Sequence, residues 1–141
     1  MRRDYFTLDI REDPDDGTPT LSIDYDGPSG VLRERLTTAT GETLDGGEVD
    51  VTFRRQADTD GGVLSLTNRM TGEFVLEVMA DPGEIDGFVA AAESHDDGEY
   101  RVVLTDSDGE SVAYEKGTLL VYDHDGSLLR QRSLIPGGVE L

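Results

Sequence analysis

Short stretches of alternating apolar and polar residues, separated by clusters of Gly, Asp and Pro, recur along the whole chain. In "TLSIDYD" (20–26), for example, Leu21, Ile23 and Tyr25 alternate with polar residues. Because successive side chains of a strand point to opposite faces of a sheet, this alternation predicts strands with one buried face. The stretches cover residues 5–10, 20–26, 31–38, 49–55, 62–68, 73–80, 100–105, 111–116, 118–123 and 128–135. About nine short strands joined by tight turns predict an antiparallel β-sandwich or open barrel.

One segment, "ADPGEIDGFVAAAESHDDG" (80–98), has a helical period instead. Asp81 is suited to the N-cap and Pro82 to the first helical position. The residues that follow form one apolar stripe at helical spacing, made of Ile85, Phe88, Val89 and Ala92. The segment therefore predicts a short α-helix at about residues 82–94 that covers a sheet or closes an open end. We expect an α+β fold, mainly β, in a single domain over residues 1–141.

The chain is strongly acidic along its whole length. Its 31 acidic and 12 basic residues give a net charge of −19, and the acidic residues are spread evenly rather than gathered in a tail. In molar salt the Debye length is only about 3 Å, so the self-repulsion of such a surface largely vanishes. The composition is typical of a halophilic, haloarchaeal protein. It disfavours nucleic-acid binding, which needs a basic surface.

Several kinds of localisation and chemistry are disfavoured by what the sequence lacks. It has no cysteine, hence no disulfide, thiolate zinc site or thiol nucleophile. It has no apolar run of about 18 residues, so we expect no membrane association. The adjacent arginines near its start are not followed by the apolar segment of an export signal, which favours a cytoplasmic protein. No nucleophile, phosphate-binding or dinucleotide motif occurs. We therefore expect no enzyme, no catalytic residue and no cofactor.

The spacing Asp-x-Asp-Gly occurs four times, at residues 24–27, 58–61, 106–109 and 123–126. It resembles the start of a calcium loop, but none of the four stretches supplies the remaining oxygen ligands and the closing acid. Asp-Gly between two strands is instead a strong signal for a hairpin turn. We interpret the motifs mainly as turns and expect no metal site, His95 and His124 included. A divalent-cation-binding module that uses these turns stays open as an alternative.

Two segments, "IDYDGPSGVLRERL" (23–36) and "VYDHDGSLLRQRSL" (121–134), share a strand, an Asp-Gly turn, an apolar pair and Arg-x-Arg. If each is a hairpin, its two arginines project from one face of the return strand. These four residues are Arg33, Arg35, Arg130 and Arg132. They are candidates for binding an acidic protein partner, since arginine makes directional, bidentate contacts with carboxylates. The structural alternative is that they pair with nearby acids or cover apolar surface.

Some segments of the sequence resemble a protein family, although they contain no catalytic or ligand-binding motif. "TNRMTGEFVLEV" (67–78) and "LLRQRSLIPGGVEL" (128–141), with "MRRDYFTL" and "GPSGVLRERL", resemble a family of small acidic haloarchaeal proteins of unknown function. The resemblance covers nearly the whole chain and supports the halophilic interpretation, but it implies no activity. The sequence thus favours a non-enzymatic module that binds a protein partner or associates with itself.

We expect the stability of the protein to depend on salt. Below roughly half-molar KCl the fold should loosen or unfold, because the repulsion among carboxylates grows as the Debye length increases. Thermal melts followed by circular dichroism across a KCl series measure this dependence. A cooperative melt at the same temperature in dilute and in molar KCl would contradict the halophilic interpretation.

Overall fold

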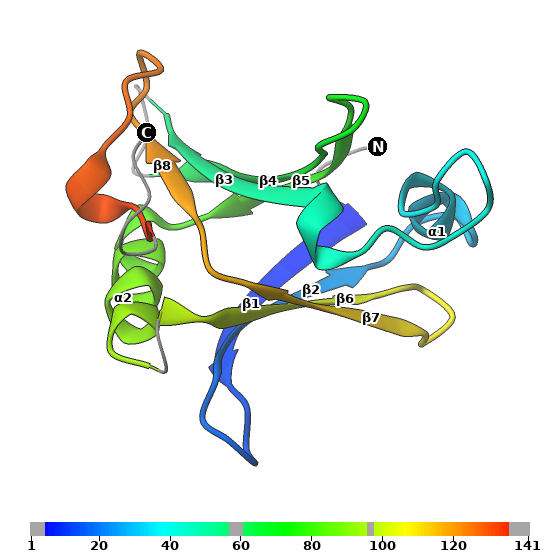
Figure 1. Cartoon of the computed structure of the whole chain (residues 1–141), viewed down its shortest axis with the longest axis horizontal. Coiled ribbons are helices and arrows are strands. Elements are labelled where there is room, and N and C mark those ends of the chain that lie inside the picture. Colours follow the sequence, from blue (N-terminus) through cyan, green and yellow to red (C-terminus); the bar gives the residue numbers. More distant parts are fainter. Residues whose placement is uncertain (1–4, 57–60, 96–97, 136–141) are drawn as a thin grey trace.

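The computed structural model describes residues 5–56, 61–95 and 98–135, and it contains two four-stranded sheets (Figure 1). The first sheet has the order β1-β2-β6-β7 and the second has the order β5-β4-β3-β8. The strands are β1 (Phe6–Glu12), β2 (Pro19–Tyr25), β3 (Val49–Arg55), β4 (Gly62–Asn68), β5 (Phe74–Ala80), β6 (Tyr100–Thr105), β7 (Ser111–Lys116) and β8 (Leu120–Tyr122). The helices are α1 (Val31–Arg35), α2 (Pro82–Glu93) and two 3-10 turns, η2 (Gly46–Glu48) and η4 (Arg130–Arg132).

The predicted α+β, mainly β, architecture is confirmed: the two sheets face each other as in a sandwich and do not close into a barrel (Figure 1). The described residues contain eight strands, against about nine expected. The sheets are mixed, because β2 pairs with β6 and β3 pairs with β8 in parallel, whereas the other pairings are antiparallel. Both parallel pairings arise because the chain leaves one sheet, crosses to the other and later returns.

The core lies between the sheets and is built from the alternation that the sequence shows. The inward positions of β2, β3, β4 and β6 are at most 3% exposed; they are Leu21, Ile23, Val49, Val51, Phe53, Leu64, Leu66, Tyr100, Val102 and Leu104. Tyr100 also donates a hydrogen bond from its hydroxyl to the carbonyl of Thr118 at 2.7 Å. Burial raises the pKa of this hydroxyl far above its usual value, so Tyr100 stays a neutral donor inside the core.

The predicted helix at 82–94 is confirmed as α2. The Asp81 side chain accepts a hydrogen bond from the Glu84 backbone N–H at 3.1 Å, which caps the helix as expected. The predicted stripe is buried, and the ring of Phe88 meets the ring of Tyr100 edge to face, with centroids 5.3 Å apart. The helix therefore covers one end of the sandwich (Figure 1).

The strands predicted at 31–38 and 128–135 are wrong. Residues 31–35 form α1, which begins after Gly30 with φ 84°. Leu32 and Leu36, one helical turn apart, are both buried. Residues 130–132 form η4, and only isolated bridges link Leu128 and Leu134 to the β8 region. A segment of five or six residues with two apolar positions fits either period, and for α1 the helical period is the one that buries both Leu32 and Leu36.

The Asp-Gly motif at 106–109 forms the expected hairpin turn between β6 and β7. The motif at 123–126 forms a similar closed turn after β8, followed by a single antiparallel bridge from Tyr122 to Leu128 in place of a second strand. Gly109 and Gly126 have φ 87° and 89°, and the turns 106–110 and 123–127 are closed by backbone hydrogen bonds of 2.7 and 2.8 Å. The motif at 24–27 ends β2 and leads toward α1 instead of turning back into a strand. Residues 58–60 of the remaining motif lie outside the described residues.

Two glycines should respond in opposite ways to alanine. A Cβ at Gly62 would meet the ring of Phe53 and lie 2.8 Å from the carbonyl oxygen of Arg54, whereas a Cβ at Gly87 has nothing within 4 Å. We expect Gly62→Ala to destabilise the protein by about 1–3 kcal/mol through overpacking. Gly87→Ala, inside α2, should stabilise it by about 0.5–1 kcal/mol. Urea denaturation at molar KCl measures both, and a Gly62→Ala protein as stable as the wild type would contradict this packing.

Candidate functional site

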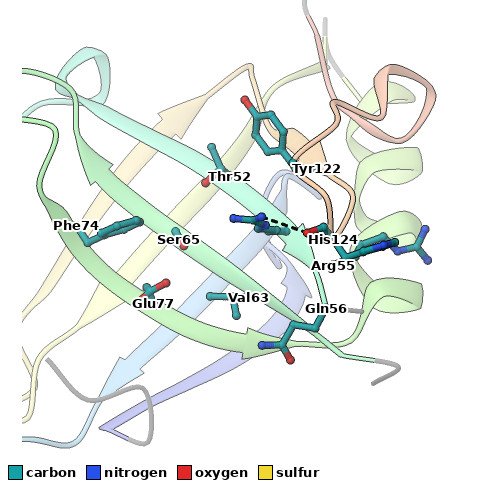
Figure 2. A pocket seen from close by; sticks show the side chains of 11 residues that line it. Thr52, Arg55, Gln56, Val63, Ser65, Phe74, Glu77, Tyr122 and His124 are labelled. Atoms are coloured by element: carbon teal, nitrogen blue, oxygen red, sulfur yellow. Dashed lines mark hydrogen bonds between the residues drawn. The ribbon is translucent and has the colours of Figure 1, made fainter. Parts of the chain in front are cut away.

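The outer face of the second sheet carries a depression of about 590 Å³, shown in Figure 2. The strand register arranges its side chains in rows across the sheet. One row runs from β8 to β5 through Tyr122, Arg54, Val63 and Met79, and the next through Leu120, Thr52, Ser65 and Glu77. We call this depression the trough and define it by the side chains that line it, chiefly Thr52, Arg54, Arg55, Val63, Ser65, Phe74, Glu77, Tyr122 and His124.

The floor of the trough is recessed because short side chains lie between long ones. Ser65 and Val63 point outward, yet each is only 7% exposed. Phe74 rises beside them and is 54% exposed, although large apolar side chains are usually covered. An exposed aromatic ring at the rim of a recess is an arrangement that suits binding.

Arg54 crosses the trough and bonds to a backbone carbonyl rather than to a carboxylate. Its Nη2 donates to the carbonyl oxygen of His124 at 3.1 Å, the dashed line in Figure 2. The acids of the same turn are engaged locally: Asp123 Oδ1 accepts the His124 backbone N–H at 2.8 Å, and Asp125 Oδ1 accepts that of Ser127 at 2.9 Å. Hydrogen bonds from the Ser127 N–H and side chain lower the pKa of the Asp125 carboxyl. The turn therefore leaves Arg54 without an acidic partner.

Most other arginines in the described ranges are neutralised by acids. Ion pairs join Arg11 to Asp9, Arg33 to Glu110, Arg69 to Asp50, Arg132 to Asp86, and Arg101 to Asp13, Asp16 and Glu115. Arg35, Arg54 and Arg55 differ, because none of the three has an ion pair with a carboxylate among the described residues. In a chain with 31 acids and 12 bases, two adjacent arginines that lack such a pair within the described ranges are unusual. Both line the trough together with one acid, Glu77, so two arginines face one carboxylate there and the trough is locally basic on an acidic protein.

The four arginines singled out from the sequence do not share a face. Arg33 and Arg35 lie on α1 and Arg130 and Arg132 on η4, at opposite ends of the molecule (Figure 1). The predicted geometry of two return strands is therefore wrong, since both segments are helical. Arg33 and Arg132 pair with acids, as the structural alternative proposed, although these acids are not cross-strand neighbours. A role of the four in binding a partner stays a prediction.

Arg35 has a direct connection to the trough. Its Nη1 donates to the carbonyl oxygen of Phe74 at 3.0 Å, across 39 residues of sequence. This bond holds the first residue of β5, whose ring forms one wall of the trough. Arg35 is therefore a positioning residue for the trough. The trough itself has a sequence signal, because inward Val51 and Phe53 require that Thr52 and Arg54 of "VDVTFRR" point outward.

The two histidines lie apart from each other. His95 Nε2 is 3.3 Å from the hydroxyl of Thr18, and His124 Nδ1 is 3.0 Å from the carboxylate of its neighbour Asp123. Across residues 5–56, 61–95 and 98–135, no three acidic or histidine side chains come together as a metal-binding group. The same residues include no helix with the length and apolar character needed to cross a membrane.

The fold and site define a β-sandwich-like protein with a basic, partly apolar trough on one outer sheet face. The whole chain, residues 1–141, matches DUF5793, a family of unknown function, and the protein belongs to that family. No curated protein and no solved structure matches the chain.

We expect calcium to leave the melting temperature unchanged at molar KCl. The carboxylates of the two closed turns already accept backbone N–H groups, at 2.7 and 3.1 Å for Asp106 and Asp108 and at 2.8 and 2.9 Å for Asp123 and Asp125. These bonds orient each carboxylate toward its own turn, and no three acidic or histidine side chains of the described residues come together to hold a cation. A ligand that binds only the native state must raise its melting temperature. A saturable rise with calcium, lost in Asp123→Asn, would contradict this expectation.

Proposed function

We propose that this protein is a non-enzymatic interaction module that binds an acidic protein partner in the trough. The observation that carries the proposal is the pair Arg54 and Arg55, which has no carboxylate among the described residues of a chain with net charge −19. A guanidinium that no acid of the described residues neutralises is available to a carboxylate from outside. Self-association is the second form of the same proposal, with acids of another copy as the partner.

The exposed ring of Phe74 supports a partner that is a protein rather than a simple ion. Apolar contact and a directional guanidinium bond both persist in concentrated salt, whereas long-range attraction does not, because the Debye length is about 3 Å at 1 M. We extend the proposal to a haloarchaeal cytoplasm, on the support of the charge composition. Binding there would rely on short contacts within the trough.

The cation-binding alternative has less support. It needs carboxylates that converge on one point, whereas the turn acids that the structure describes are directed at their own backbone. The calcium titration described above decides it independently of any partner. Arg33, Arg35, Arg130 and Arg132 enter the proposal only as further contacts at the two ends of the molecule.

Affinity capture from a haloarchaeal lysate at molar KCl tests the proposal with two matched variants. The first combines Arg54→Gln with Phe74→Ala inside the trough. The second combines Arg11→Gln with Met70→Ala, which removes an equal charge and another exposed apolar side chain outside it. We expect the wild type and the second variant to retain the same partner, and the first to retain about tenfold less.

Circular dichroism and sedimentation complete the capture experiment. Circular dichroism must show that both variants melt as the wild type does. Equal capture by both folded variants would contradict binding in the trough. A fourth bait, with Arg33, Arg35, Arg130 and Arg132 all changed to Ala, then tests the two ends of the molecule. Sedimentation at molar KCl separates self-association from binding of another protein.

A further inference from the structure

The trough runs across the strands rather than along them. The short side chains of its floor, Thr52 and Ser65, are register partners on β3 and β4. The row with Arg54 and Val63 lies on one side of this floor, and Glu77 continues the floor on β5. Phe74, the register partner of Thr67, lies on the other side of the floor. Same-face residues of a strand are about 6.8 Å apart and neighbouring strands about 4.8 Å. The floor therefore has the width of a single polypeptide chain.

The edge of the sheet next to the trough is already occupied. On β8, the Val121 N–H donates to the hydroxyl of Ser133 at 2.8 Å, and the Val121 carbonyl accepts the Leu129 N–H at 2.8 Å. Leu119 and Leu134 exchange two further backbone bonds. An incoming strand has no free ladder at this edge. At the β8 end of the trough, a partner is therefore recognised by the side chains of the outer face.

The charged and the apolar side chains lie at different places in the trough. Arg54 lies on β3 and uses one donor on His124, which leaves other N–H groups of its guanidinium for a ligand. Phe74 lies two strands away, on β5. Its register partner on β4 is Thr67, four residues beyond Val63, the partner of Arg54. About 10 Å across two strand spacings and about 14 Å along the strand place Arg54 and Phe74 roughly 17 Å apart, the length of about five extended residues. The hydroxyls of Thr52 and Ser65 lie between them and can bond to a peptide main chain.

Resting on the proposed function, we infer that the trough binds one extended segment of the partner protein. This segment places a carboxylate on Arg54 and a large apolar side chain against Phe74, about five residues apart. Arg55, beside His124 at the end of β3, provides a second site for an acid that follows or precedes the first. The ligand class is an acidic, extended peptide and not a folded surface.

Selection from a displayed library of random heptapeptides at molar KCl tests this ligand class. We expect the wild type to enrich peptides with Asp or Glu about five residues from Phe, Leu, Ile or Met. Arg54→Gln should lose this enrichment, and Arg11→Gln, which removes an equal charge outside the trough, should keep it. Phe74→Ala should lose the enrichment of the apolar residue. Met70→Ala, which removes another exposed apolar side chain outside the trough, should keep it.

A selected peptide is then synthesised with its acid and with the matching amide. We expect the amide to bind the wild type about tenfold more weakly, and to bind Arg54→Gln as well as the acid does. Enriched peptides without acids, or no enriched peptides, would overturn the inference. Lysate capture that depends on the trough would still support the proposed function in that case, so the two failures are distinguishable.

Discussion

The burial of alternate apolar residues between the two sheets is the interaction on which the rest of the structure depends. A fully buried Leu, Val or Phe side chain contributes roughly 1.5–3 kcal/mol relative to exposure. The inner positions of β3 and β4, which include Val51, Phe53, Leu64 and Leu66, are at most 3% exposed. Because the period of a strand is two, this burial also determines which side chains point outward. The trough is thus a consequence of the same register that builds the core.

Charge is distributed in a way that gives the trough its chemistry. Acids serve as turn caps and as partners of Arg11, Arg33, Arg69, Arg101 and Arg132. The Arg101 side chain, for example, is 21% exposed and holds the β1–β2 loop through Asp13 at 2.6 Å. Surface pairs of this kind contribute little to stability, but they neutralise most of the described arginines. Arg54, bonded to a carbonyl, keeps its charge available.

Local patterns in the sequence predicted the local parts of this structure well. Six of the ten expected strands needed little change, and α2 was predicted by its cap and apolar stripe. The strand predicted for "VLRERL" was wrong because the segment is short enough to fit two periods. Its spacing of Leu32 and Leu36 fits a helix, and the structure has a helix there. The parallel pairings of β2 with β6 and of β3 with β8 join distant segments, which no local pattern encodes. The trough needs that long-range order, since Tyr122 of β8 must lie beside Arg54.

The most direct test of binding in the trough is a covalent crosslink between the rim of the trough and the bound partner. The chain has no cysteine, so a single introduced thiol can carry a photoreactive benzophenone at one defined place. His124→Cys places the probe at the rim of the trough, and Ala113→Cys places it on β7 of the first sheet. After illumination in a lysate at molar KCl, the account predicts one covalent adduct from position 124 and none from position 113. Equal adducts from both positions, or an adduct from position 113 alone, would contradict it.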